Sequence, residues 1–428
     1  MTTTRTRIGT SPPPTLPLPA LLSLATAVFI TCLTEVLPAG LLPAMARDLG
    51  VGESAAGQSV TVYAVGTAVT AIPLTAATSG WPRKRLLLVS MAGFCAANTV
   101  TALSGSYPLT MAARFVAGVA AGLAWALLAG YARRLAPAGL EGRAIAVAMA
   151  GIPVALSVGV PAATYLGKAA DWRTAFLVMS GITVLLLGWI TVVVPERPGD
   201  SRQLGGPAAR EEGAGAFPLP ADRSPLPTDP TPLPTAPHPL LGAARVPGVA
   251  PVLLVTAAFV LAHTLLYTYV AAFLDDVGLG GRTDLVLLVF GAASLLSVWA
   301  VGARIHRALR ALTLGGVLLV GTAAAVLGAG AHVPALVYGA AALWGLGWGG
   351  APSLLQTAVG EAGGEQADAA QVLLVTLWNV ATAAGGILGG LLLDLLGTRA
   401  LPWTVLVLLV PAFATAAAAR NHGFPQRR

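Results

Sequence analysis

The chain has 428 residues, of which 56% are hydrophobic and only 10% are charged, and its mean hydropathy is +0.77. Soluble domains carry about 25% charged residues, so this composition excludes a water-soluble globular protein and predicts a membrane protein. The net charge of +7 belongs to short loops and is not interleaved with aromatic residues, so nucleic acid is not an expected partner. Cys32 and Cys95 both lie in apolar runs, which predicts buried thiols without a disulfide or a metal site.

Long apolar stretches dominate the sequence, and each is long enough for a helix that crosses a bilayer, which needs about 20 residues. Because these runs do not alternate between polar and apolar residues, an outer-membrane barrel is excluded. We therefore predict an all-α integral membrane fold of twelve transmembrane helices in two pseudo-symmetric six-helix halves. The twelve expected spans are 18–44, 56–77, 86–104, 108–132, 143–166, 173–194, 249–274, 283–303, 311–331, 334–358, 368–395 and 400–419.

The segments around the spans set the domain organisation and the topology. The two halves are expected at 18–194 and 249–420, with short tails at 1–17 and 421–428. The tails and the loops on their side of the membrane carry nineteen Lys and Arg residues, and the opposite loops carry five. Because positive loops stay inside, we expect a multi-pass protein of the inner or plasma membrane with both termini in the cytoplasm.

Segment 195–248 separates the two halves. It contains thirteen prolines with mixed charges and no helical period. This composition is typical of an extended cytoplasmic linker, and a ligand for proline-recognising domains is the alternative.

The two halves show signs of an internal repeat. Asp48-Leu-Gly-Val-Gly52 resembles Asp276-Val-Gly-Leu-Gly280 at an offset of 228 residues, and the same offset relates Glu35 to His263. Gly118-x3-Gly122 parallels Gly345-x3-Gly349 at an offset of 227 residues. The repeat predicts halves that are equivalent in fold and unequal in charge.

Only two charged residues, Glu35 and Arg114, lie well within the apolar runs. A charge in mid-membrane is unfavourable by at least roughly 2.5–3.5 kcal/mol, so each needs a partner or a water-filled cavity. At 1.5 Å per residue, Glu35 lies about 13 Å and Arg114 about 9 Å from the same side of the membrane, within reach of each other if their helices are neighbours. The pair marks either a transport pathway or a structural ion pair.

Several motifs resemble those of the major facilitator superfamily, specifically its twelve-span drug:proton antiporters of the arabinose-efflux-permease-like branch. The resemblance covers nearly the whole chain outside the tails and the linker. It rests on Thr34–Gly50 in span 1, Arg114-Phe-Val-Ala-Gly118 in span 4, Gly159-Val-Pro161 with Leu166-Gly167 in span 5, Asp171-Trp-Arg173 with Phe176, Tyr267-Thr-Tyr269 in span 7, and Asn379 with Gly385-Gly386 in span 11.

Two motifs depart from the family pattern. In the loop between spans 2 and 3, Ser79 takes the place of the usual acid and Pro82 that of a glycine, ahead of Arg83 and Lys84. The antiporter motif reads Gly-x-Pro where Gly-Pro is common. These departures put the gate at that loop, and the inference to antiport, in question.

The resemblance implies alternating access around a cavity lined by spans 1, 4, 7 and 10. Access to water would switch Glu35 between its protonated and charged forms beside Arg114, which is what proton coupling requires. We therefore expect Glu35, Arg114 and His263 to couple protons to the outward release of a small lipophilic or cationic substrate. The proton gradient replaces any cofactor, and a monomer is expected.

His263 has two possible roles: a second titrating site, or a neutral hydrogen-bonding partner between helices. Tyr267 lies one turn further along the same face. With Trp344 and Trp348 of span 10 it can form an aromatic wall for planar or cationic compounds, although aromatic residues in spans also serve in packing. Gln356 and Asn379 are further candidate polar contacts for a substrate.

Glycines and prolines mark the expected moving parts. Gly118, Gly159 and Pro161, together with Arg83 and Lys84, are the candidate gating residues. The Gly-x3-Gly strings allow helices to approach closely. Prolines at 38, 43, 153 and 161 are expected to break or kink spans 1 and 5.

The sequence also bears on functions other than drug transport. The sequence contains no Walker, GxSxG or HExxH motif and no Cys/His cluster, so an enzyme is not expected. A proton-linked or passive permease or exporter for sugars or other metabolites is the main alternative, but these spans are poor in the Asn, Gln and acidic residues that it would need. A sensor or scaffold is a third possibility, and it would not require Glu35 to titrate.

Overall fold

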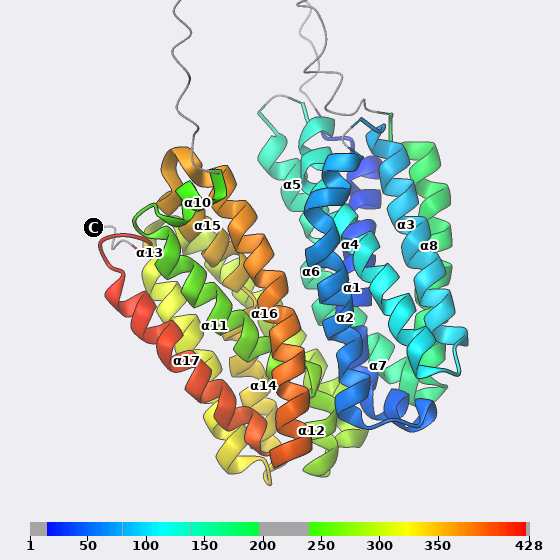
Figure 1. The fold of residues 1–428 in the computed structure, drawn as a ribbon, viewed down its shortest axis with the longest axis vertical. Helices are drawn as coiled ribbons and strands as arrows, with labels where there is room; N and C mark the ends of the chain where they lie inside the picture. Colours follow the sequence, from blue (N-terminus) through cyan, green and yellow to red (C-terminus); the bar gives the residue numbers. More distant parts are fainter. Residues whose placement is uncertain (1–14, 79, 138, 197–238, 425–428) are drawn as a thin grey trace, which may run out of the picture.

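The computed structural model describes residues 15–78, 80–137, 139–196 and 239–424. Within these ranges the regular structure is entirely helical, and the helices form two bundles that lie side by side (Figure 1). Both bundles are built from long apolar helices, as the hydropathy of the sequence predicted.

The N-terminal half contains residues 18–193. Its fifth span is divided into short helices around a π-helical turn. The elements are α1 (Leu18–Leu49), α2 (Glu53–Ala77), α3 (Arg83–Leu103), α4 (Tyr107–Leu135), α5 (Glu141–Met149), α6 (Gly151–Val154), η1 (Ala155–Gly159), α7 (Val160–Ala169) and α8 (Trp172–Val193).

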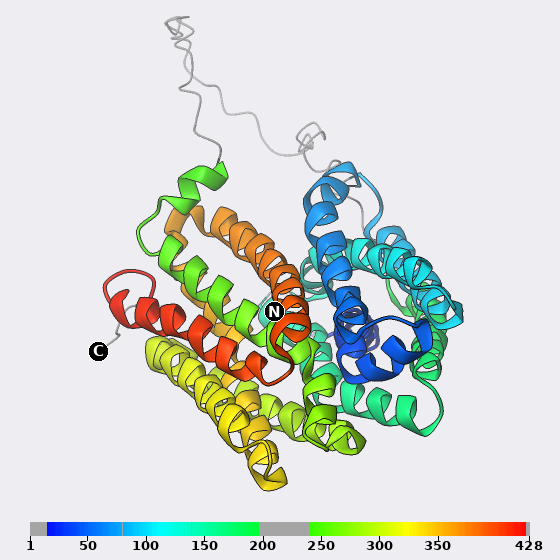
Figure 2. The same cartoon turned by 60° about the horizontal axis from the view of Figure 1, so that its bottom comes forward.

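The C-terminal half follows the same plan, and Figure 2 shows the two halves from a second direction. Its elements are α10 (Pro239–Ala244), α11 (Val249–Thr268), α12 (Val270–Asp276), η2 (Gly280–Arg282), α13 (Thr283–Gly330), α14 (Pro334–Trp348), α15 (Ala351–Gly363), η3 (Gly364–Gln366), α16 (Ala367–Leu396) and α17 (Ala400–Ala418).

The predicted twelve-helix, two-half fold is confirmed. By length and composition, ten stretches of the described residues are able to cross a membrane. One of these, Pro334–Leu396, is 63 residues long and contains two of the predicted spans. Helix α2 is outside the ten, yet it packs within the bundle against α4 and α16. Each of the twelve predicted spans therefore corresponds to one helix or to a broken helix.

Several details differ from the sequence-based expectation. The predicted loop between spans 8 and 9 is reduced to a kink: α13 covers both spans as two helices that meet at Ala308, whose backbone is non-helical (φ −138°, ψ 29°). Helix α1 runs through Pro38 and Pro43 as one helix, so these prolines do not break span 1, and a kink there stays a prediction. Span 5 is interrupted as expected, by a π-helical turn that begins two residues after Pro153. Span 7 is interrupted at Tyr269, which was not foreseen.

The linker prediction falls mostly on residues 197–238, which lie outside the described ranges. Residues Pro239–Ala244, which we placed in an extended linker, instead form helix α10, which packs on α11 and α16. The expected cytoplasmic linker therefore ends in a short helix on the C-terminal half.

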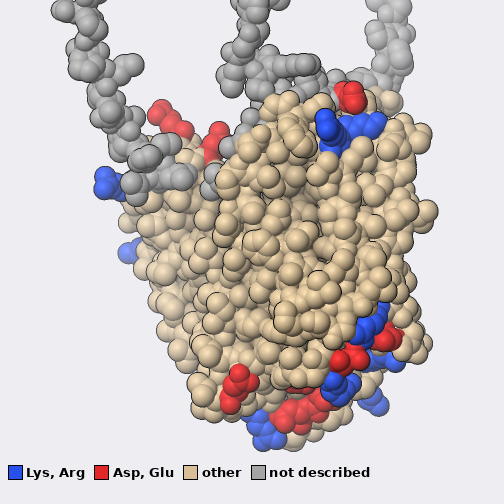
Figure 3. Space-filling model, turned by 45° about the vertical axis from the view of Figure 1, so that its right-hand side comes forward, with Lys and Arg blue, Asp and Glu red and all other residues tan. Residues whose placement is uncertain are grey.

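The bundle has two ends, and they are named here for what they carry. The linker end holds Leu18, the first residue of α1, together with Val193 and Pro239, the residues that flank the linker. The distal end holds the α1–α2 turn at 50–52 and its counterpart after α12. On the face drawn in Figure 3, charged residues gather at the two ends and leave a broad uncharged middle. Such a belt suits a bilayer, where exposed charges are costly.

Equivalent contacts in the two halves support the internal repeat. In the N-terminal half, Gly118 packs so closely on Tyr63 that a Cβ atom would overlap the Tyr63 carbonyl oxygen. In the C-terminal half, Gly345 packs in the same way on the carbonyl oxygen of Phe290. The offset is 227 residues for both members of the pair, so the α2–α4 and α13–α14 pairs are built alike.

The two halves meet through α2 with α16, α7 and η1 with α13, and α1 with α12. Several hydrogen bonds and ion pairs join the halves toward the distal end, for example from Lys168 of α7 to Asp284 of α13. In Figure 1 the ribbons of the two halves are closest around α7 and α12 and diverge toward α5 and α15. The structure therefore has its halves joined at the distal end.

Candidate functional site

Glu35 and Arg114 lie on adjacent helices, which is the condition under which their similar depth brings them within reach. Helix α1 places Glu35 in a partly buried position, and α4 places Arg114 where its side chain is fully buried. Arg114 Nη2 donates to the Glu35 carbonyl oxygen at 3.4 Å, and Nε donates to the Ser59 carbonyl oxygen at 3.4 Å. The guanidinium also lies over the Tyr63 ring, 4.9 Å from its centroid.

Glu35 and Arg114 do not form an ion pair, which was one of the two alternatives: among the described residues, no carboxylate lies within salt-bridge distance of the guanidinium. Main-chain carbonyls and an aromatic face stabilise the cation instead. Arg114 Nη1 is buried without a hydrogen-bond partner. One nitrogen of a buried cation is thus left available to a further acceptor.

Uncharged polar groups surround this pair. Asn98 Nδ2 donates to Thr34 Oγ1 at 3.1 Å, next to Glu35 in sequence, while Asn98 Oδ1 has no partner. Tyr63 donates its hydroxyl to the Thr31 carbonyl oxygen at 3.1 Å. Tyr63 was not identified from the sequence. The 227-residue offset of the repeat relates it to Phe290, which was also not identified, so the repeat alone gave no signal for either residue.

In the C-terminal half, His263 is the centre of an aromatic group formed by His263, Tyr267, Phe290, Trp344 and Trp348. The imidazole stacks on Trp348 with centroids 3.6 Å apart and an interplanar angle of 7°. It also stacks on Tyr267 at 5.2 Å. Trp344 Nε1 donates to His263 Nδ1 at 3.1 Å, so that nitrogen carries no proton and the ring is neutral in this arrangement.

The structure thus brings together four of the predicted residues: His263, Tyr267, Trp344 and Trp348. Phe290 was missed, because nothing in the sequence of α13 distinguishes it from a packing residue. The Tyr267 hydroxyl is buried and has no hydrogen-bond partner. The aromatic group also contacts α16, because the ring centroids of Trp348 and Trp378 are 5.6 Å apart.

The remaining predicted substrate contacts lie elsewhere. Gln356 is exposed on α15, and its carbonyl oxygen accepts from Gln371 Nε2 at 2.7 Å. Asn379 follows Trp378 on α16 and donates to the Val375 carbonyl oxygen of its own helix at 2.9 Å. Neither belongs to the aromatic group, and their role in binding stays a prediction.

The predicted gating residues have contacts within the N-terminal half. Lys84 Nζ donates to the Thr191 carbonyl oxygen at 2.8 Å and ties α3 to α8. Arg83 is buried at the start of α3, and Pro161 is buried in α7. Gly159 packs against Phe29 and its neighbours on α1. Ser79, which replaces the family's acid, lies outside the described residues, so the gating roles stay predictions.

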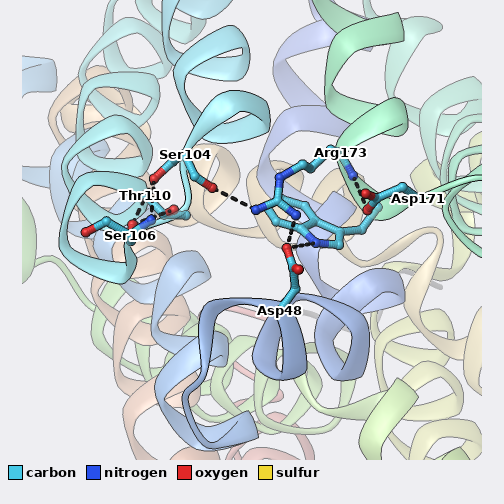
Figure 4. Close-up of polar contacts among 7 residues, drawn as sticks. Asp48, Ser104, Ser106, Thr110, Asp171 and Arg173 are labelled. Carbon is cyan, nitrogen blue, oxygen red and sulfur yellow. Dashed lines mark hydrogen bonds and ion pairs between the residues drawn. The ribbon is translucent and has the colours of Figure 1, made fainter.

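A clasp of Asp48, Trp172 and Arg173 closes the distal end of the N-terminal half (Figure 4). The Asp48 carboxylate pairs with Arg173 and accepts from Trp172 Nε1 at 3.1 Å. Arg173 also donates to the Ser104 carbonyl oxygen at 2.9 Å. The clasp therefore joins α1, the α3–α4 turn and α8.

The C-terminal half has an equivalent clasp. Arg399 Nε lies 3.6 Å from Asp276 Oδ2, and Thr398 donates to the same oxygen at 2.8 Å. Asp276 is the repeat partner of Asp48. This second pair shows that the short similarity of 48–52 to 276–280 reflects equivalent positions in the fold.

The geometry defines a polytopic membrane protein whose two repeated halves enclose unlike groups, one cationic and one aromatic. Such an arrangement is typical of secondary transporters. Among the described residues, no cluster of three or more His, Cys, Asp or Glu side chains is placed to bind a metal.

The chain belongs to the Major Facilitator Superfamily, whose sequence model matches residues 24–373. It is therefore a membrane transporter rather than an enzyme, as the motifs in spans 1, 4 and 5 predicted.

The chain is similar to several curated proteins along nearly its whole length, and its fold is similar to that of a solved structure. It is 30% identical to the transcription regulatory protein OpdE of Pseudomonas aeruginosa, with 94% of this chain and 93% of OpdE covered. It is 31% identical to a chloramphenicol efflux pump of Mycobacterium tuberculosis (87% and 85% covered) and 26% identical to the purine ribonucleoside efflux pump NepI of Escherichia coli K12 (88% of each covered). The crystal structure of the human organic anion transporter MFSD10 matches with a TM-score of 0.65 at 18% identity, over 95% of this chain and 100% of that one.

Proposed function

We propose that the chain is a proton-coupled exporter of lipophilic small molecules that works by alternating access in the plasma membrane as a monomer. The similarity to efflux pumps for chloramphenicol and for purine ribonucleosides supports export. The excess of Lys and Arg at the linker end supports a cytoplasmic location for that end. With the halves joined at the distal end, the structure then corresponds to an inward-facing state.

The observation that carries proton coupling is the arrangement of Glu35 and Arg114. The buried guanidinium is held by two carbonyl oxygens and the Tyr63 ring, while its Nη1 has no partner. Both forms of Glu35 can accept a hydrogen bond, but only the ionised form offers a negatively charged acceptor for the free nitrogen. Loss of the proton therefore adds an ion pair between α1 and α4 to the carbonyl contacts that Arg114 already makes.

The aromatic group is the proposed substrate contact. A neutral imidazole stacked on Trp348 and hydrogen-bonded by Trp344 presents flat apolar faces and no charge. Offset stacking of aromatic rings is favourable by about 0.5–1.5 kcal/mol beyond the area that it buries. The group therefore favours planar aromatic compounds, and Glu35 supplies the carboxylate that a cationic compound would need.

The test uses inside-out membrane vesicles with an imposed proton gradient. We expect Glu35→Gln to abolish gradient-driven uptake of chloramphenicol or an aromatic dye, while exchange of labelled for unlabelled substrate continues without a gradient. Glu141→Gln, at the start of α5, is the matched control and should transport as the parent does. Undiminished gradient-driven uptake by Glu35→Gln would rule out the coupling role.

Export of a metabolite is the second candidate function, and the relationship to NepI favours it. A purine base would stack on the same aromatic faces as a drug. Competition separates the two: nucleosides should inhibit uptake of the dye if metabolites are the substrates, whereas drugs alone should inhibit it if the protein is a drug exporter.

A further inference from the structure

Beyond the proposed substrate and proton sites, a polar contact joins the two halves at the distal end. It involves Gln58 of α2, Tyr269 between α11 and α12, and Gly386 of α16. Gln58 Nε2 donates to the Tyr269 hydroxyl oxygen at 3.3 Å and to the Gly386 carbonyl oxygen at 3.3 Å. The Tyr269 hydroxyl donates to the same carbonyl oxygen at 2.8 Å. One side chain of the N-terminal half is thus bonded to two elements of the C-terminal half.

The backbone is shaped to receive the tyrosine ring. Helix α11 ends at Thr268, and the non-helical conformation of Tyr269 (φ −108°, ψ 16°) separates it from α12. The ring is fully buried and lies where Cβ atoms would stand on Gly57 of α2 and on Gly389 and Gly390 of α16. Three glycines, one from the N-terminal half and two from the C-terminal half, therefore form a slot for the ring, and a larger residue at any of them would overlap the Tyr269 side chain.

The Gln58 amide nitrogen and the Tyr269 hydroxyl are both hydrogen-bonded across the boundary, and the hydroxyl also donates to the Ser54 carbonyl oxygen of the N-terminal half at 3.4 Å. Polar groups buried in a membrane protein are unfavourable unless they are hydrogen-bonded, so the contact is stable only while the halves are together. When α2 moves away from α16, the Gln58 amide loses both partners in the C-terminal half and keeps only the Ser54 carbonyl oxygen of its own helix, and the tyrosine ring leaves its slot.

We propose that Gln58 and Tyr269 form a latch that holds the distal end closed, and that its release sets how readily the halves separate there. The two are positioning residues: they touch neither the aromatic group nor the Glu35–Arg114 pair in the described contacts. Removing the latch should raise the population of the state that is open at the distal end.

The experiment measures distances between spin labels in the full chain, in a background with Cys32→Ala and Cys95→Ala. Gly105→Cys and Gly281→Cys report the distal end, since both positions are exposed and open, and they lie on opposite halves. Gly142→Cys and Glu365→Cys report the linker end in the same way. Each pair is measured in the parent and in the latch variants by pulsed electron paramagnetic resonance.

The latch variants are Gln58→Leu and Tyr269→Phe, which remove the hydrogen bonds and retain most of the side-chain volume. We expect the ratio of long to short distal distances to rise about 3- to 18-fold for each hydrogen bond lost, the range that measured bonds between membrane helices correspond to. The linker-end distances should shorten in the same samples, because alternating access couples the two ends.

The matched control is Tyr107→Phe at the same end of the bundle. Its hydroxyl donates to the Ala55 carbonyl oxygen at 3.0 Å, a bond within the N-terminal half, so both distance distributions should stay as in the parent. Unchanged distal distances in both latch variants would overturn the proposal. So would a longer distal distance without shortening at the linker end, because that result indicates local loosening. The measurement needs neither substrate nor a proton gradient, so its outcome is independent of the proposed export.

Discussion

The close contact between α2 and α4 makes a prediction about Gly118 that the structure allows to be worked out. An added Cβ atom would overlap the carbonyl oxygen of Tyr63 and approach its carbonyl carbon at 2.9 Å, and these backbone atoms cannot rotate away. Thr67 Oγ1 also donates to the Gly118 carbonyl oxygen at 3.0 Å across the same contact. Gly118→Ala must therefore separate the two helices. Overpacking of this kind costs about 1–3 kcal/mol, against a gain of up to about 1 kcal/mol in helix propensity.

The matched control is Gly130→Ala, three turns further along α4, where nothing lies within 4 Å of an added Cβ atom. This variant should be unchanged or up to about 1 kcal/mol more stable. We expect Gly118→Ala to have a lower midpoint of thermal unfolding in detergent than the parent, and Gly130→Ala not to. Gly345→Ala should repeat the loss, because Gly345 meets the carbonyl oxygen of Phe290 in the same way. Equal midpoints for Gly118→Ala and Gly130→Ala would refute the reasoning.

Two further predictions concern the distal end. Asp48→Asn removes the charge that pairs with Arg173 and keeps an acceptor for Trp172. Because the Asp48 side chain is 44% exposed, the loss of stability should be under about 1 kcal/mol and should be smaller in high salt. Thermal unfolding at two salt concentrations measures both effects. Glu53, at the distal surface ahead of span 56–77, has its pKa raised above 4.5 by partial burial and by Asp275, against the opposing effect of Arg47. The protonated form is thus favoured in the folded protein, so this stabilising contribution is present at acid pH and is lost as the pH rises from 4.5 through the raised pKa. The difference in midpoint between the parent and Glu53→Gln should change over that pH range, and a constant difference would contradict this account.

The fold was predictable from the sequence because a bilayer imposes one simple requirement. A run of about 20 apolar residues must be helical, so hydropathy and length alone located all twelve spans. Helix continuity was harder to predict: α1 runs through Pro38 and Pro43 as one helix, because neighbouring helices stabilise a backbone that local rules would interrupt.

The candidate site was predictable only in part. Charge scarcity identified Glu35 and Arg114, and their similar depth meant that neighbouring helices would bring them together. Arg114 donates to the main-chain carbonyl oxygen of Glu35 and not to its carboxylate. This preference depends on side-chain conformation and packing, which could not be predicted from one sequence. Gln58 and Tyr269 were not assigned a joint role, because their contact depends on how one half rests against the other.

The paired clasps at the distal end have a mechanical consequence. Asp48 with Arg173, and Asp276 with Arg399, each fasten the first helix of a half to its last, and neither clasp crosses between halves. Each clasp therefore holds the helices of its own half together at the distal end. The halves can separate at this end without breaking either clasp. Opening therefore requires only the contacts between the halves to break, and each half can move as a rigid body.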